Sequence, residues 1–174
     1  MSQSYCREVR HTLSQINDLP CEEFVRVVGP ILEHSPWIAE RVAAQRPFAS
    51  MEALHVALCD VVRSADADVQ LALIRAHPDL VERAALTTES QGEQAAAGLM
   101  NLSRDEAELF ERYNSEYGDR FGFPFVICAR LNKKEAILAA FPARLRNSPT
   151  QERATALEEI FKIAQLRLTD LIRP

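Results

Sequence analysis

Apolar residues recur three and four positions apart along most of the chain, whereas the strict alternation that marks a strand is almost absent. The first spacing places apolar side chains along one face of an α-helix. The composition agrees, because only five of the 174 residues are glycine and the chain is rich in leucine, alanine, glutamate and arginine. We therefore predict an all-α fold, a single compact, bundle-like domain of about eight helices.

Prolines and capping side chains mark the helices of the first half of the chain. The pattern predicts one helix after Pro20, one from Pro36 to near Pro47, one over 50–63 and one over 69–76. Trp37 should point inward on the second of these, and Asp66 or Asp68 should cap the last. Residues 1–12 are polar, so we expect a flexible N-terminal extension before a helical domain at 13–174.

The second half of the chain shows similar signals. The pattern predicts helices over 89–100, after Ser103 with its capping partner Glu106, over 125–131 behind Pro124, after Asn132 with Glu135, and a long final helix from Ser148. Gly118 and Gly122 should interrupt the helical structure and lead into the loop FGFPF. The next helix should then begin behind Pro124, within that loop.

Charge and cysteine content exclude several function classes. The net charge is −5 and the charged residues are interspersed, so the basic stripe of a nucleic-acid-binding protein is missing. No apolar run approaches the roughly 20 residues that span a bilayer, and the N-terminus lacks the apolar centre of a signal peptide. The four cysteines, Cys6, Cys21, Cys59 and Cys128, form no CxxC pair. We expect reduced core cysteines in a cytoplasmic protein.

The first candidate site is the segment HPDL at 77–80. Pro78 disfavours helical geometry at His77, so the histidine should lie where a helix ends and the chain turns. The negative end of the helix dipole favours a protonated imidazole there, as a proton donor near neutral pH requires. The alternative is a structural histidine that ends the helix and bonds to a nearby carbonyl.

The second candidate is the polar run TESQGEQ, followed by small residues at 95–98. On a helix, Ser90, Glu93, Gln94 and Ala97 share one face. A hydroxyl, a carboxylate and an amide would then be adjacent, and the small residues suggest that another element packs closely. The alternative is an ordinary solvated polar face.

The third candidate is FGFPFVICAR at 121–130. If a helix begins after Pro124, its first turn offers unpaired backbone N–H groups to a carboxylate or carbonyl. Arg130 could pair with a carboxylate of the protein or of a substrate. The alternative is an aromatic core plug followed by a buried helix. HxH, HExxH, GxSxG and Gly-rich phosphate-loop patterns are all missing, so we expect neither a metal nor a cofactor.

These three segments, in this order and spacing, resemble the family of OHCU decarboxylases, which act on 2-oxo-4-hydroxy-4-carboxy-5-ureidoimidazoline. The segment EHSPW and the C-terminal run RATALEEIFKIAQLRL are similar as well, so the resemblance covers about Leu13 to the C-terminus. It implies an all-α enzyme of urate breakdown that forms (S)-allantoin without cofactor or metal. Members are often dimeric, so a homodimer is an option for this chain, with a small-molecule substrate as its partner.

The resemblance also assigns roles to residues. It implies His77 as a catalytic residue, and we assign Glu93 to catalysis with it. The substrate-binding residues would be Pro78, Ser90, Gln91, Gly92, Gln94, Phe125, Val126, Ile127, Cys128 and Ala129, to which we add Arg130. Decarboxylation without a cofactor is chemically reasonable because the conjugated imidazolinone ring is its own electron sink. Two alternatives remain: a related lyase or hydrolase acting on another ureido compound, and a non-enzymatic helical adaptor.

Overall fold

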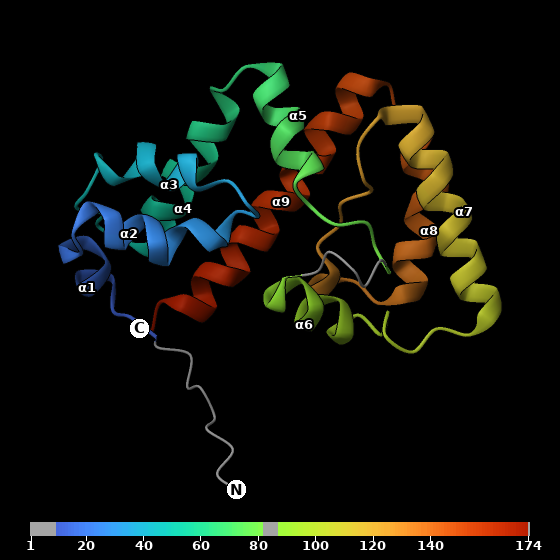
Figure 1. The fold of residues 1–174 in the computed structure, drawn as a ribbon, viewed down its shortest axis with the longest axis horizontal. Coiled ribbons are helices and arrows are strands. Elements are labelled where there is room, and N and C mark those ends of the chain that lie inside the picture. Colours follow the sequence, from blue (N-terminus) through green and yellow to red (C-terminus); the bar gives the residue numbers. More distant parts are fainter. Residues whose placement is uncertain (1–9, 82–86, 174) are drawn as a thin grey trace, which may run out of the picture. The chain divides into compact units, whose positions relative to one another are not determined.

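The computed structural model describes residues 10–81 and 87–173, and these residues are predominantly helical (Figure 1). The helices are α1 (Leu13–Asp18), α2 (Cys21–Val28), η1 (Gly29–Ile31), α3 (Pro36–Ala43), α4 (Met51–Arg63), α5 (Ala67–Arg75), α6 (Thr88–Ala96), α7 (Arg104–Phe121), η2 (Ala129–Leu131), α8 (Lys134–Arg144) and α9 (Pro149–Leu171). Within the described ranges no strand is found beyond an isolated bridge between His11 and Ile172. The predicted all-α fold is confirmed. No helix in these ranges is long and apolar enough to cross a membrane.

Two compact units make up the described part of the chain. The first combines residues of Met1–Ser64 with those of Ala164–Pro174, and the second is Ala65–Ile163. The expected division into an extension at 1–12 and a domain at 13–174 stays a prediction, because residues 1–9 lie outside the described residues. His11, which belongs to the expected extension, is paired: its N–H donates to Leu171 O at 2.9 Å and its O accepts from Arg173 N–H at 2.8 Å.

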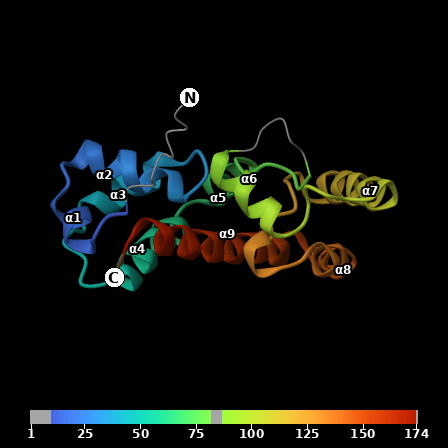
Figure 2. The same cartoon turned by 90° about the horizontal axis from the view of Figure 1, so that it is seen from below.

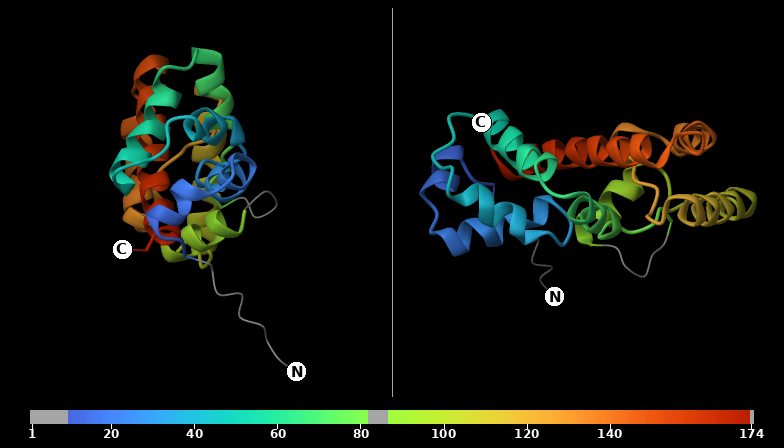
Figure 3. Two further views of the ribbon diagram at one scale, coloured as in Figure 1. Left: turned by 90° about the vertical axis from the view of Figure 1, so that its left-hand side faces the viewer. Right: turned by 90° about the horizontal axis from the view of Figure 1, so that it is seen from above.

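In the first unit, α2 packs against α3 and α3 against α4 (Figures 1 and 3). Helices α2, α3 and α4 lie close to their expected positions, with Ser50 capping α4 by accepting from Ala53 N–H. Helix α1 was not predicted, although Thr12 and Gln15 form a complete capping box at its start. Trp37 is half-buried rather than directed fully inward, and the Arg41 guanidinium lies 4.9 Å from the centre of its ring.

In the second unit, α7 and α8 lie side by side and run in the same direction (Figures 1 and 2). Lys134 pairs with Glu106 near the first turns of both helices, and Arg144 reaches Tyr117 near their last turns. The chain must therefore return along the length of α8, about 16 Å for its turns, before α8 begins. Residues 124–128 make this return without helical structure, ahead of the short η2.

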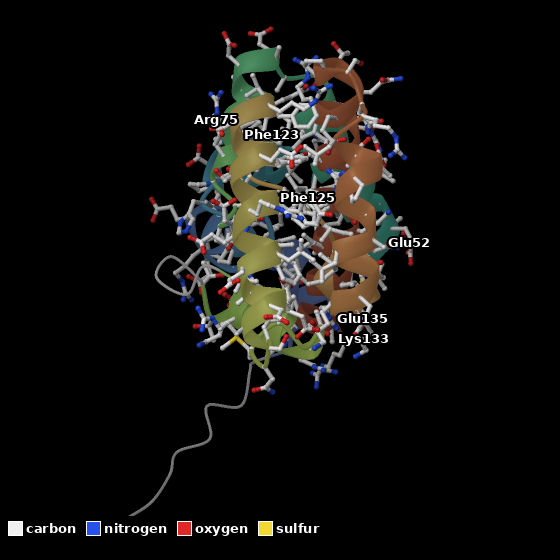
Figure 4. The ribbon with its side chains drawn as sticks, turned by 90° about the vertical axis from the view of Figure 1, so that its right-hand side faces the viewer. Glu52, Arg75, Phe123, Phe125, Lys133 and Glu135 are labelled. Atoms are coloured by element: carbon white, nitrogen blue, oxygen red, sulfur yellow. The ribbon has the colours of Figure 1, made fainter. Side chains whose placement is uncertain are left out.

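The helix predicted over 125–131 is therefore wrong. The aromatic ring of Phe125 stacks on Phe141 of α8 at 3.8 Å and meets Tyr117 of α7 edge-on at 5.1 Å. Figure 4 shows Phe125 between the two helices. The ring can be buried between α7 and α8 only if the chain at 124–128 is not helical. This burial outweighs the local preference of Pro124 for the start of a helix. The aromatic plug, the alternative for this segment, is present.

Three other boundaries differ from prediction for local reasons. Helix α5 begins at Ala67, with Asp66 at its N-cap position but without a capping bond from that side chain. Helix α7 continues through Gly118 and ends at Phe121, and Gly122, its C-cap residue, has φ 73°. The cap predicted for α8 is wrong, because its N-cap residue is Lys133, and the Asn132 side chain instead donates to Cys128 O.

Helix α6 ends at Ala96, four residues before the predicted end. Gly98 has φ 86° and donates to Ala95 O, while Leu99 N–H donates to Gln94 O. These two bonds form a Schellman motif, in which glycine is favoured because its position requires a left-handed backbone. The capping box of Ser103 and Glu106 at α7 is confirmed, with both reciprocal bonds present.

Candidate active site

His77 lies just beyond the end of α5, as Pro78 predicts, and its side chain is 8% exposed. Its Nδ1 is 3.0 Å from the backbone O of Leu73. A carbonyl oxygen only accepts hydrogen bonds, so Nδ1 must carry a proton, and Nε2 is the nitrogen at which this ring would exchange a proton with a ligand. The carbonyl bond expected for a structural histidine is thus present. It also fixes the tautomer and the orientation that a proton-transferring imidazole needs.

The polar face of α6 is turned inward. Ser90 and Gln94 are buried, Ala97 is buried beside them, and Glu93 is half-buried. The alternative of a solvated face therefore does not describe Ser90 and Gln94. The Thr87 side chain caps the start of α6 by accepting a hydrogen bond from Ser90 N–H at 3.2 Å.

The other predicted residues of this helix lie on its outer side. Gln91 and Gly92 are exposed, and a Cβ at Gly92 would meet nothing within 4 Å. Ala95 and Ala96 are exposed as well. The close packing that we expected along residues 95–98 is therefore restricted to the inward side, at Ala97.

A hydrogen bond from a backbone N–H to a side chain connects the His77 segment to α6. Val81 N–H donates to Gln94 Oε1 at 3.0 Å, and Leu80 O accepts from the Asn114 side chain of α7 at 2.8 Å. Val81 has φ 73°, an uncommon conformation for a β-branched residue that costs roughly 1–2 kcal/mol. The two bonds hold the chain there. Because the Gln94 amide oxygen accepts from Val81 N–H, the NH2 group of Gln94 is the end that would donate a hydrogen bond to a ligand.

The segment 125–129 is buried as a whole. Phe125, Val126, Ile127, Cys128 and Ala129 are each at most 9% exposed, which applies to their peptide groups as well as to their side chains. These groups are not the first turn of an α-helix, as we expected, but an open stretch whose amides take no part in helical pairing. Arg130 follows on η2 with an exposed side chain.

Helix α6 and this segment meet. Helix α6 packs against η2, and Lys134 N–H donates to Ala97 O at 3.1 Å. Burial raises the pKa of the Cys128 thiol, and the carboxylates of Glu159 and Glu93 raise it further. The Glu93 carboxylate is thus among the charges that disfavour the thiolate of Cys128. The raised pKa keeps the thiol neutral at pH 7, so Cys128 is not a thiolate nucleophile.

Sequence reasoning missed the residues that hold the segment. Arg144 Nη1 donates to Val126 O at 2.6 Å, and Glu159 Oε2 accepts from Cys128 N–H at 2.8 Å. Glu152, which is fully buried, pairs with Arg144 at 2.5 Å. On the sequence these look like ordinary charges on amphipathic helices, and no local spacing distinguishes them. The first unit holds a similar buried pair, Glu33 with Arg167 at 2.6 Å.

The second unit thus brings together the three segments that the sequence singled out. They offer an oriented imidazole, a half-buried carboxylate, a buried hydroxyl and amide, and a stretch of backbone amides. Such a set can transfer protons and stabilise developing negative charge on a small substrate. Among the described residues, no group of three or more His, Cys, Asp or Glu is placed to hold a metal ion.

Comparison with known proteins gives a consistent family. A profile of the family described as OHCU decarboxylase matches residues 17–169. Proteins named 2-oxo-4-hydroxy-4-carboxy-5-ureidoimidazoline decarboxylase are 46% identical in Haloferax volcanii, over 91% of this chain and 95% of the relative, and 46% identical in Amia calva, over 92% and 94%. A crystal structure of (S)-allantoin synthase superimposes with a TM-score of 0.78 and 31% identity over 93% of this chain, which spans 54% of that chain. The chain belongs to the OHCU decarboxylase family.

Proposed function

We propose that this protein decarboxylates 2-oxo-4-hydroxy-4-carboxy-5-ureidoimidazoline (OHCU) to (S)-allantoin in the breakdown of urate, without a cofactor. Relatives with this name align over nearly their whole length. The observation that carries the proposal is the meeting of the three segments in one unit. His77 with its fixed tautomer is connected through Val81 and Gln94 to α6, and Glu93 of that helix lies near Cys128.

The reaction needs only groups that this chain has. When the carboxylate leaves as CO2, its electron pair forms a C4=C5 double bond and the ring imine nitrogen takes up a proton. The resulting enol then loses the proton of its 4-hydroxyl and gains one at C5, which gives allantoin. Delivery of the C5 proton from one face makes the product a single enantiomer. The protein must hold the substrate, stabilise charge on its oxygens and deliver that proton.

The proposed roles follow from chemistry and placement. His77 supplies the proton, and Glu93 accepts the hydrogen bond of the 4-hydroxyl. Ser90 and the NH2 group of Gln94 bind the ureido and ring amide groups, and the peptide groups of 125–129 bind the carbonyl end. The remaining proposed contacts are Pro78, Gln91, Gly92 and Arg130.

An optical assay tests the function directly. Freshly made OHCU is supplied to the purified protein, and circular dichroism follows the product. Spontaneous decay should give racemic allantoin, so only an enzyme that protonates one face produces a growing chiral signal. Loss of absorbance without that signal would contradict the proposal. It would favour the adaptor or an enzyme for another ureido compound.

Glu93→Gln should lower kcat/KM for OHCU by about tenfold, since the amide keeps the size of the side chain but not the carboxylate that orients and activates the hydroxyl. Steady-state kinetics by circular dichroism would measure this. Glu89→Gln is the matched control, because this substitution removes the same charge at an exposed position of the same helix. An unchanged rate and affinity in Glu93→Gln would remove Glu93 from the mechanism.

Two further features belong to the proposal. We place the protein in the cytoplasm, which is supported by Cys21, Cys59 and Cys128 being thiols and not disulfides. A homodimer remains an expectation from the family resemblance.

A further inference from the structure

Two side chains hold the peptide groups on either side of Ile127. On one side, Arg144 Nη1 of α8 donates to Val126 O at 2.6 Å. On the other side, Glu159 Oε2 of α9 accepts from Cys128 N–H at 2.8 Å. Both partners are charged, and hydrogen bonds of that kind are about twice as strong as those between neutral groups. Residues 126–128 are therefore fixed by side chains where no helix or strand fixes them.

The direction of the Ile127 backbone follows from these two bonds. In a trans peptide the C=O and the N–H point to opposite sides. Because Val126 O points to Arg144, the N–H of Ile127 points away from Arg144. Because Cys128 N–H points to Glu159, the O of Ile127 points away from Glu159. Both backbone groups of Ile127 are thus turned away from the residues that hold its neighbours.

Arg144 is itself held in place by a buried network. Its Nε donates to Glu152 Oε1 at 2.6 Å, and its guanidinium lies 4.4 Å from the centre of the Phe125 ring. Tyr117 donates to the same oxygen of Glu152, and the Asn147 side chain donates to the other at 2.7 Å. A guanidinium with so many partners has one conformation, so it can set the position of Val126 O closely.

We propose that Arg144 and Glu159 are positioning residues for the decarboxylation. They hold the peptides flanking Ile127 and so aim its N–H at the carbonyl end of the substrate. The inference rests on the proposed function. It adds that the direction of this amide is set by two distant charged side chains, one on each neighbouring helix.

Glu159 is the better residue for a test, because its side chain is partly exposed and removing it leaves the buried network around Arg144 intact. Glu159→Ala removes the acceptor for Cys128 N–H. We expect kcat/KM for OHCU to fall by about tenfold or more, since small misplacements of a positioned group can cost up to about 100-fold. Glu159→Gln still offers an oxygen to the same N–H and should restore most of the activity. Lys162→Gln removes the ion pair of Glu159 but not the acceptor, and it should behave as the wild type.

Hydrogen exchange at the Cys128 amide, measured by NMR, is the second readout. We expect it to accelerate in Glu159→Ala and to return toward the wild-type rate in Glu159→Gln. Faster exchange with unchanged kcat/KM would overturn the positioning role, and so would unchanged exchange. Loss of activity in Glu159→Gln equal to that in Glu159→Ala would also overturn it, because charge and not the hydrogen bond would then matter. A wild-type protein that forms no chiral allantoin would instead refute the proposed function, and the exchange rates would still show whether Glu159 fixes this peptide.

Discussion

Replacing His77 with asparagine should lower the turnover of OHCU by roughly 10² to 10⁴, the usual contribution of a positioned acid–base group. Asparagine has no group that titrates near neutral pH, so it cannot deliver a proton to the product. Its side-chain NH2 lies about where Nδ1 lies in histidine and can still donate to Leu73 O. The hydrogen bond that holds the segment is thus retained while the proton-transferring nitrogen is lost.

Circular dichroism of the product gives the turnover, and thermal unfolding gives the stability of the same variant. The midpoint of unfolding should change little. His55→Asn is a control, since His55 lies on α4 in the first unit, beside Cys59. Near-normal formation of chiral allantoin by His77→Asn would refute the assignment of His77. A large fall in stability together with the loss of turnover would show that the bond to Leu73 is the main role of the ring.

The parts of the site that sequence could predict are those whose cause is local. Pro78 places His77 outside the helix, and the three- and four-residue spacing places Ser90, Gln94 and Ala97 on one side of α6. Both expectations agree with the structure because the relevant forces act within one turn. The capping box of Ser103 and Glu106 agrees for the same reason.

The segment 125–131 was misassigned because two local rules and one distant contact compete there. Proline often begins a helix, and a short apolar run fits either a helix or an extended strand. The deciding contact is the stacking of Phe125 on Phe141, sixteen positions away, together with the parallel course of α7 and α8. Nothing in the spacing of 121–130 reports where those helices lie.

The residues that hold the segment are missed for a related reason. Arg144 bonds to Val126 across 18 positions, and Glu159 bonds to Cys128 across 31. A basic residue in the last turn of a helix is also common on surfaces, where it complements the helix dipole. Only the folded chain distinguishes a buried arginine that directs a backbone from an exposed one.

The buried pair of Arg144 and Glu152 leads to the largest expected effect on stability. Glu152 is fully buried and Arg144 is 8% exposed. Both side chains make further hydrogen bonds, to Tyr117, Asn147 and Val126 O. Removing one partner leaves the other charge buried without compensation, which typically costs about 3–5 kcal/mol. Arg144→Met and Glu152→Leu should each lower the free energy of unfolding by about that amount.

The double variant Arg144→Met/Glu152→Leu should lose much less than the sum of the two single variants, because no charge is then left unpaired and the side chains are apolar. Urea unfolding of the four proteins gives the coupling energy directly. Arg104→Met is the control, since Arg104 forms an exposed pair with Glu108 and its removal should leave stability unchanged within error. If the single variants were as harmless as this control, or if their effects simply added, the pair would not be a coupled buried unit.

Because Arg144 also holds Val126 O, the double variant should still bind OHCU more weakly than the wild type even where its stability is recovered. That result would separate the contribution of Arg144 to the fold from its contribution to the site.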